Sequence, residues 1–232
     1  MPRGGLCAHC GVRSVAACSA LEDWELETLE SITESKQFEP GQTLFEQGDE
    51  PRFIFNLTEG TVRLVKLLPN GRRQVIGFVF PGDMLGLAHH GAYTCSAEAI
   101  DRVRVCRFPR AKLLDLLDEF SNLKTRLLDI AADELSEAQE QMLLLGRKSP
   151  VEKLASFLWR LHENSHCAEM ISRIDLPMGR ADIADYLGLT IETVSRTFTR
   201  LRNDGVIQLD GANHVLITDE AALADLAEAM GD

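Results

Sequence analysis

The apolar positions between Ser121 and Lys148 recur at alternating steps of three and four residues. This stretch contains no Pro, and no Gly before Gly146, and it is long enough for roughly seven helical turns. Such a narrow seam is typical of a coiled coil, whereas a helix on a globular core carries a wider apolar stripe. We predict a helix over residues 121–148 that pairs with a second chain, and a buried core helix is the alternative. The seam residues are Leu128, Ala131, Leu135, Ala138, Met142 and Leu145.

The segment before this helix consists of short apolar and polar runs that Gly and Pro interrupt. Its turn signals include Pro69-Asn70-Gly71, and Asn-Gly favours the positive φ angles of hairpin turns. Short strands with frequent turns predict a small antiparallel barrel or jelly roll. We expect a helix at 21–35, strands at 42–45, 53–58, 61–68, 73–80, 94–99 and 102–108, and a helix at 110–117.

The segment after the long helix predicts a second, mainly helical unit. Ser149 and Pro150 suit the N-cap and first position of a helix at 151–164, which a polar linker at 165–172 follows. Two further helices, at 180–187 and 191–202, are separated by Gly188, and Thr190 caps the second. A hairpin is expected at 206–209 and 214–217. This order of elements is a winged helix-turn-helix.

The second helix of this motif carries polar residues opposite its apolar residues Val194, Phe198 and Leu201. Arg can donate two hydrogen bonds to guanine, a carboxylate can accept one from cytosine, and Ser can reach either base. A helical hairpin with a solvated charged face is the alternative. The candidate DNA-contacting residues are Glu192, Thr193, Ser195, Arg196 and Arg200, and Thr197 and Arg202 are also expected to be exposed.

Composition narrows the class of protein. The formal net charge of −12 argues against unspecific coating of nucleic acid, although nine Lys/Arg balance nine Asp/Glu between Arg147 and His214. No apolar run reaches the roughly 18 residues of a membrane span, and the N-terminus lacks the apolar stretch of a secretory signal. We therefore expect a cytoplasmic protein of one or two domains that does not contact membranes. We find no nucleophile–base pair and no phosphate-binding loop in the sequence, so we do not expect an enzyme.

The segment LGLTIETVSRTFTRLRNDGVIQ, with PGD, the β-rich front half and the long helix, resembles the Crp/Fnr family of bacterial transcription regulators. The resemblance covers nearly the whole chain. It implies an α+β fold with a cyclic-nucleotide-binding-like β jelly roll, a long dimerisation helix and a C-terminal winged helix-turn-helix. The corresponding segments are a cysteine-rich arm (1–20), a β-barrel sensor domain (21–120), the dimerisation helix (121–148) and a DNA-binding domain (149–232).

The resemblance also implies partners. A homodimer would bind double-stranded DNA at a TTGAT-N4-ATCAA-like palindrome, which Glu192, Ser195 and Arg196 would read as the Fnr-type triad. It would activate anaerobic or microaerobic genes through contacts with RNA polymerase.

Three of the six cysteines, Cys7, Cys10 and Cys18, lie within the first eighteen residues. Clustered thiolates bind zinc or iron–sulfur clusters, and three ligands need a fourth. The resemblance to Fnr-type oxygen sensors implies a 4Fe-4S cluster that these three cysteines hold with a fourth from the barrel. A zinc knot or free thiols are the alternatives.

Cys95 and Cys106 compete for the fourth place. The stretch VCRFPR around Cys106 looks like the family's sequence around its fourth ligand. Strand alternation places Cys106 opposite the core residues Val103 and Val105, and its Arg neighbours favour thiolate. By the same alternation, Cys95 lies on the side of its strand that carries small residues, which a core would bury. We therefore predict Cys106 as the fourth ligand.

Other candidate ligands are weaker. Cyclic-nucleotide binders of this fold keep a Gly-Glu pair and an Arg after the Pro-Gly turn, and this chain has no Arg between Gly82 and Ile100. We therefore expect no cyclic nucleotide, because a buried phosphate needs cationic or N–H donors. His89 and His90 are expected in a surface loop rather than on a haem, and Cys167 as an exposed thiol.

The sequence thus predicts an oxygen-responsive regulator whose cluster controls dimerisation and DNA binding. Two alternatives stay open. One is a cluster-free member that responds to nitric oxide or another redox signal, and the other is a zinc-binding regulatory subunit.

Overall fold

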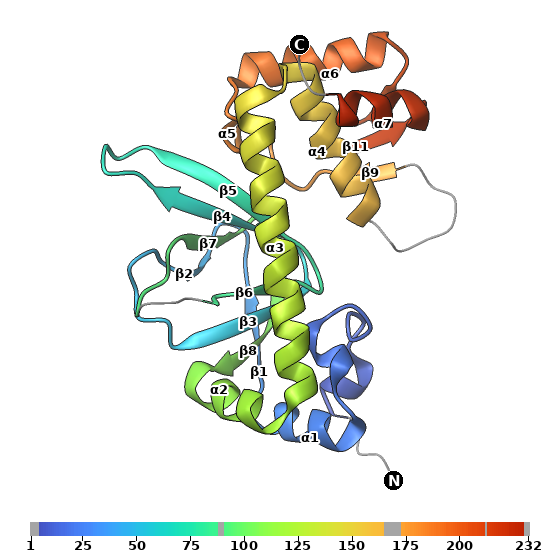
Figure 1. Cartoon of the computed structure of the whole chain (residues 1–232). Helices are drawn as coiled ribbons and strands as arrows, with labels where there is room; N and C mark the ends of the chain where they lie inside the picture. The colour runs from blue at the N-terminus through green and yellow to red at the C-terminus, as the bar shows by residue number, and fades with distance from the viewer. Residues whose placement is uncertain (1–4, 88–90, 165–172, 212, 230–232) are drawn as a thin grey trace. The chain divides into compact units, whose positions relative to one another are not determined.

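The computed structural model describes residues 5–87, 91–164, 173–211 and 213–229. The chain divides into two compact units, Met1–Leu135 and Ser136–Asp232, with the boundary inside helix α3 (Ser121–Arg147) (Figure 1). No helix in the described ranges is long and apolar enough to cross a membrane.

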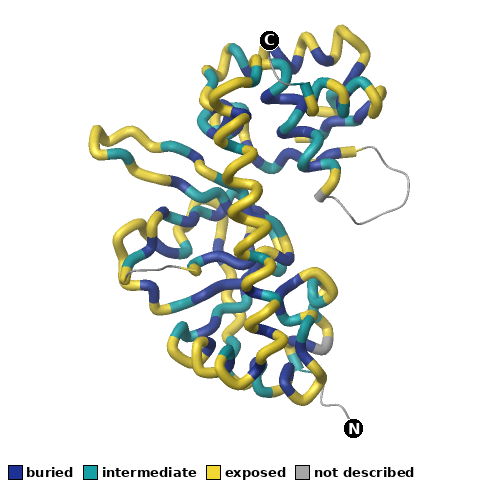
Figure 2. Tube along the Cα trace, in the orientation of Figure 1, coloured by how far each residue is buried: buried dark blue, intermediate teal, exposed yellow. Residues whose placement is uncertain are grey.

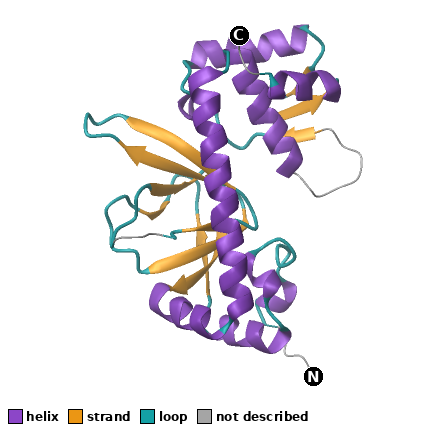
Figure 3. Ribbon diagram, in the orientation of Figure 1, coloured by secondary structure: helices purple, strands orange, loops and turns teal. Residues whose placement is uncertain are grey.

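Unit 1 is built on two antiparallel sheets of four strands, in the orders β1-β8-β3-β6 and β2-β7-β4-β5 (Figure 3). Leu57 and Val105 of the first sheet pack against Val62 and Ala97 of the second in one apolar core. This sandwich confirms the predicted β fold. The strands are β1 (Glu34–Phe38), β2 (Thr43–Phe45), β3 (Phe53–Glu59), β4 (Val62–Leu67), β5 (Arg73–Val79), β6 (Met84–Leu85), β7 (Ser96–Ala99) and β8 (Val103–Pro109).

The predicted strands were found with ends shifted by up to two residues, but β1 and β6 were missed. The helix expected to reach Ser35 ends at Ser31 as α1 (Asp23–Ser31), and β1 follows it. Only Phe38 of β1 is buried, so this strand lacks the apolar alternation that identifies a half-buried strand. It forms because its backbone pairs with β8, a long-range contact.

A second apolar cluster joins the helices of unit 1 to the N-terminal arm. The arm contains two short 3-10 turns, η1 (Cys7–His9) and η2 (Ala17–Ala20). A capping box starts α1, in which the Glu22 backbone N–H donates to Glu25 Oε2 over 2.8 Å. The apolar cluster includes Cys7, Ala17, Leu29, Leu113 and Leu116 of α2 (Arg110–Glu119), Phe120, and Leu123 and Leu127 of α3. Because residues of the arm belong to this cluster, the arm is part of the fold.

Unit 2 contains the predicted winged helix-turn-helix. Its helices after α3 are α4 (Pro150–Asn164), α5 (Arg180–Leu187), α6 (Ile191–Asn203) and α7 (Glu220–Glu228). A sheet of β9 (Arg173–Asp175), β10 (Ile207–Asp210) and β11 (His214–Ile217) has the order β10-β11-β9. The short strand β9 was not predicted, and the linker expected at 165–172 lies outside the described residues.

The turn between α5 and α6 has the backbone that its residues favour. Gly188 ends α5 in the left-handed region at φ 64°, where a residue without Cβ is under no strain. Thr190 Oγ1 then accepts a hydrogen bond from the Thr193 backbone N–H at 3.2 Å and starts α6.

Helix α3 has a buried and an exposed face. Leu123 and Leu127 are buried in unit 1, whereas Leu128, Leu135 and Met142 are 66%, 61% and 71% exposed. The remaining predicted seam residues, Ala131, Ala138 and Leu145, are exposed as well. Figure 2 shows the middle of α3 as a largely exposed stretch. The seam is therefore not part of the core of this chain.

Adjacent residues of α3 provide a matched test of the two faces. Leu127→Ala removes a side chain from the apolar cluster and is expected to lower the free energy of unfolding by about 2–5 kcal/mol. The control Leu128→Ala should change it by less than about 0.5 kcal/mol. Trp24 packs edge-on against Phe120 at 5.5 Å, so its fluorescence in a Trp159→Phe background reports urea unfolding of unit 1 in dilute protein. Equal losses in both variants would contradict this assignment of faces.

Candidate cysteine centre and DNA-reading helix

Four cysteines of unit 1 line one cavity. They are Cys7 of η1, Cys10 just after it, Cys18 of η2 and Cys106 of β8, and the cavity is partly open to solvent. Its other walls are mostly apolar and include Leu29, Met84, Phe108, Leu123 and Leu127. The structure therefore brings together the four predicted ligands, which lie up to 99 positions apart in the sequence (106 − 7).

Backbone hydrogen bonds fix the local shape of the arm around its cysteines. The Cys10 N–H donates to the Cys7 carbonyl at 3.4 Å, and the Leu21 N–H donates to the Cys18 carbonyl at 3.2 Å. On β8, Val103 and Val105 are fully buried in the core between the sheets, and Cys106 has the opposite parity. The predicted parity of Cys106 is thus confirmed.

Three thiols of this cavity, those of Cys7, Cys18 and Cys106, have a raised pKa and are poor acids. Burial is the largest cause and raises the pKa of Cys7 to about 12, of Cys106 to about 11, and of Cys18 above its usual value. The neighbouring cysteines and Glu30 raise the pKa of Cys7 and Cys106 further, because a thiolate would lie among other negative charges. These thiols are therefore protonated near neutral pH.

The prediction that Arg neighbours favour a thiolate at Cys106 was wrong. Arg104 pairs with Glu59 at 2.6 Å, and Arg107 donates twice to Glu34, at 2.5 and 2.8 Å. Their charges are directed at carboxylates, and burial determines the pKa of Cys106 instead.

The other candidate ligands lie elsewhere or outside the described residues. Cys95 is buried but does not line the cavity. His89, His90 and Cys167 are outside the described residues. In the described part of the chain, no group of three or more His, Cys, Asp or Glu is arranged to hold a single metal ion.

The acidic residues after the Pro-Gly turn are bound by the protein itself. Glu98 of β7 pairs with Arg63 at 2.7 Å and with Arg73 at 3.8 Å. Asp83 accepts a hydrogen bond from the Phe80 N–H at 2.8 Å and closes the turn.

Helix α6 presents one polar face to solvent. The predicted residues Glu192, Ser195, Arg196 and Arg200 are exposed, and Thr193 is half-buried. Thr197, also expected to be exposed, is 5% exposed, and its hydroxyl donates to the Thr193 carbonyl at 2.8 Å.

Thr199 lies on the same exposed face but was not predicted. Together with residues 192, 195, 196 and 200 it follows the spacing i, i+3, i+4, i+7 and i+8 of one helix face. That spacing could have identified it, and it could have excluded Thr197.

Two contacts prepare α6 for binding a polar partner. The Arg180 guanidinium stacks 3.3 Å from the centre of the Phe198 ring and holds the start of α5 on the inner face of α6. The pKa of Glu192 is lowered by a hydrogen bond from its own backbone N–H, with a further contribution from the Thr190 hydroxyl. Glu192 is therefore an ionised hydrogen-bond acceptor, as contact with a cytosine amino group requires.

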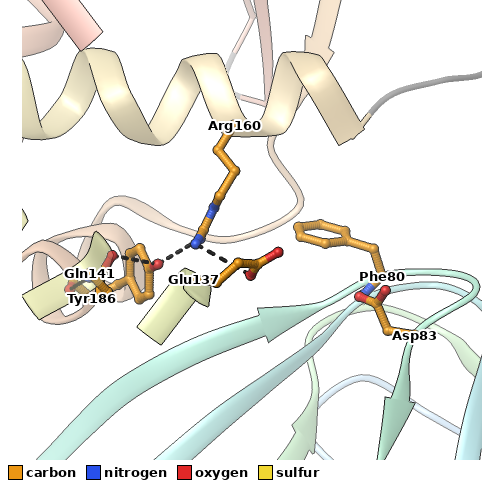
Figure 4. A network of polar contacts seen from close by, with 6 residues as sticks. All are labelled: Phe80, Asp83, Glu137, Gln141, Arg160 and Tyr186. Atoms are coloured by element: carbon orange, nitrogen blue, oxygen red, sulfur yellow. Dashed lines mark hydrogen bonds and ion pairs between the residues drawn. The ribbon is translucent and has the colours of Figure 1, made fainter. Parts of the chain in front are cut away.

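A polar network within unit 2 joins the end of α3 to the helix-turn-helix (Figure 4). The Arg160 guanidinium donates to the Tyr186 hydroxyl at 2.6 Å, and this hydroxyl donates to Gln141 Oε1 at 2.8 Å. The Gln141 amide donates back to the Tyr186 carbonyl at 3.1 Å, and Glu137 lies 3.9 Å from Arg160. Tyr186 is 3% exposed, so its hydroxyl depends on these partners.

Comparison with known proteins gives the family. Residues 35–120 match the cyclic nucleotide-binding domain, and residues 152–226 match the Crp-like helix-turn-helix domain. The chain is 43% identical over 229 residues to the nitrogen fixation regulation protein FixK of Bradyrhizobium diazoefficiens, covering 98% of this chain and 96% of that protein. This chain belongs to the Crp/Fnr family.

Two further relatives agree. The transcriptional activator protein FnrL of Cereibacter sphaeroides is 36% identical over 226 residues, which cover 95% of this chain and 91% of FnrL. The structure of FixK2 from Bradyrhizobium japonicum aligns with a TM-score of 0.80 at 32% identity, over 86% of this chain and all of that one. The Crp/Fnr proteins are DNA-binding transcription regulators rather than enzymes, which confirms the predicted class.

Tyr186→Phe tests the polar network. The variant leaves the Arg160 guanidinium and Gln141 Oε1 without this partner in a mostly buried site, so unit 2 should lose about 1–3 kcal/mol of stability. Trp24 and Trp159 are the two tryptophans of the chain, and Trp159 fluorescence in a Trp24→Phe background follows urea unfolding of unit 2. The control Ser195→Ala, on the exposed face of α6, should unfold like the parent. If Tyr186→Phe did so too, the network would not stabilise unit 2.

Proposed function

We propose that this Crp/Fnr regulator senses oxygen through a 4Fe-4S cluster held by Cys7, Cys10, Cys18 and Cys106. The cluster controls pairing of two α3 helices and binding to a TTGAT-N4-ATCAA-like palindrome. One observation carries the proposal: the three cysteines of the arm and Cys106 line the same cavity. The names of its relatives, a nitrogen fixation regulation protein and a transcriptional activator, support gene activation. On this proposal the activated genes serve low-oxygen metabolism, and activation proceeds through contacts with RNA polymerase.

The chemistry of the cavity suits this cofactor. Four cysteine ligands are the usual donor set of a 4Fe-4S cluster. Each thiolate in such a cluster binds a different iron, so the four sulfurs surround a volume and need not converge on one point. Iron also supplies the positive charge that buried thiols lack here, and binding would release their protons.

The N-terminal arm links this site to α3. Cys7 and Ala17 pack in the same group of apolar side chains as Leu123 and Leu127. A bound iron–sulfur cluster would therefore hold the arm against the first turns of the helix. Oxygen would dismantle the cluster, free the arm and weaken pairing along the exposed seam.

A paired α3 brings two copies of α6 to one operator. Recognition helices of such dimers enter successive major grooves about 34 Å apart. On this proposal Glu192, Ser195 and Arg196 contact bases, while Thr193 and Arg200 contact bases or phosphates. The acidic chain then binds DNA through a local surface rather than through its net charge.

Cys106 and Cys95, the two cysteines of the barrel, allow a matched test of which residues hold the iron–sulfur cluster. The parent protein, purified without oxygen, is expected to be brown, with about four iron and four sulfide per chain. Cys106→Ser replaces a soft thiolate by a poor ligand and should lose most of the iron and the visible absorption. Cys95→Ser should keep both. Equal iron in the two variants would exclude Cys106 as a ligand, and an iron-free parent would favour the cluster-free alternative.

Arg196→Ala tests the reading helix. The variant should lose about 1–3 kcal/mol of binding free energy on the intact palindrome and distinguish poorly between bases at one position of each half-site. Fluorescence anisotropy on the palindrome and on operators with that base changed measures both effects. Unchanged affinity and base preference would show that Arg196 does not read DNA.

A further inference from the structure

Asn56 is a neighbour of Cys106 that also lines the cysteine cavity. It lies on β3 directly opposite Cys106 of β8, and directly paired residues of antiparallel strands share a face. It is 6% exposed and lines the cavity with the four cysteines. Ser35 of β1 is the other direct neighbour of Cys106, but it is exposed and does not line the cavity.

The carboxamide of Asn56 is not satisfied by the protein. Among the residues that the structure describes, its Oδ1 has no hydrogen-bond partner. Its Nδ2 donates to the Leu57 carbonyl at 3.4 Å, a long and weak contact. Thr33 also lines the cavity, but its hydroxyl donates to the Leu29 carbonyl at 2.7 Å.

An unpaired buried amide is costly, since it has lost water without gaining a partner. A leucine in this place would fill a similar volume without that cost. The polar residue therefore indicates a partner that belongs in the cavity. Nδ2 carries two N–H groups, and the Leu57 carbonyl accepts only one of them, so the second can donate to a group in the cavity.

We propose that Asn56 positions and tunes the iron–sulfur cluster by donating an N–H hydrogen bond to sulfur beside Cys106. This inference rests on the proposed function. Hydrogen bonds to the sulfurs are among the factors that set the reduction potential of such clusters. A donor stabilises negative charge on sulfur and so favours the electron-rich state. In a reaction with dioxygen one electron would pass from the bound cluster to O2, which becomes superoxide, and the hydrogen bond from Asn56 would slow this transfer.

The test uses the full chain, loaded with iron and sulfide without oxygen. Asn56→Leu should lose its visible absorption in air about tenfold faster than the parent, at the low end of the roughly 10–100-fold cost of losing an outer-shell partner. Its midpoint potential should become more negative. Ser35→Ala, the matched control beside the same cysteine, should decay at the parental rate. Asn56→Ser, which keeps a shorter donor, should lie between the two.

A second readout needs no cluster. In the metal-free protein Asn56→Leu removes an unsatisfied amide, so its Tm should equal or exceed that of the parent. Faster decay of the loaded form together with an undiminished Tm of the metal-free form supports the inference, since a merely structural asparagine would lower the Tm. A lower Tm with parental decay and potential overturns the inference and leaves the cluster intact. A parent that binds no iron overturns the proposed function, and this inference with it.

Discussion

The rest of this structure depends on the convergence of four cysteines on one mostly apolar cavity, where burial acts on the thiols of Cys7, Cys18 and Cys106. That burial keeps these three thiols protonated, with the pKa of Cys7 raised to about 12 and that of Cys106 to about 11. Four thiolates could coexist there only with a compensating positive charge. Loading with iron would thus be coupled to the packing of the arm, because Cys7 belongs to the apolar cluster of unit 1 and Cys18 and Cys106 pack against it. A change at the cysteines is therefore a change in the packing beside α3.

Helix α3 connects this packing to the rest of the chain because it begins in unit 1 and ends in unit 2. Its first turns bury Leu123 and Leu127, while the seam from Leu128 to Leu145 is exposed. Two of the six seam residues, Ala131 and Ala138, bury much less area in a dimer than leucine would, at about 25 cal/mol per Å². On the proposed function, these two alanines would weaken the seam, and a change in unit 1 would then shift pairing. At its other end, Gln141 and Glu137 join the network around Tyr186 and Arg160.

Much of the fold and of the two candidate sites could be predicted from the sequence, wherever the sequence pattern was local or periodic. The alternation of β8 gave the parity of Cys106, and the Gly188 turn gave the boundary between α5 and α6. Predictions failed where a structure or an ion pair depends on residues far away in the sequence. Strand β1 is polar and forms by pairing with β8, and Arg104 and Arg107 pair with Glu59 and Glu34 rather than with a thiolate. Thr197 is polar but lies on the buried side of α6, so its residue type predicts an exposure that its position on the helix does not allow. Asn56 could not be found, since its importance arises from a strand register that brings residues 56 and 106 together.

The central claim is that the state of the cysteine centre controls pairing of α3. Sedimentation of the full chain measures this directly when the same sample, purified without oxygen, is examined before and after exposure to air, with its absorption recorded. We predict a dimer while the cluster absorption persists and a monomer after it is lost. The same molecular mass in both states, with the cluster demonstrably lost, would contradict it.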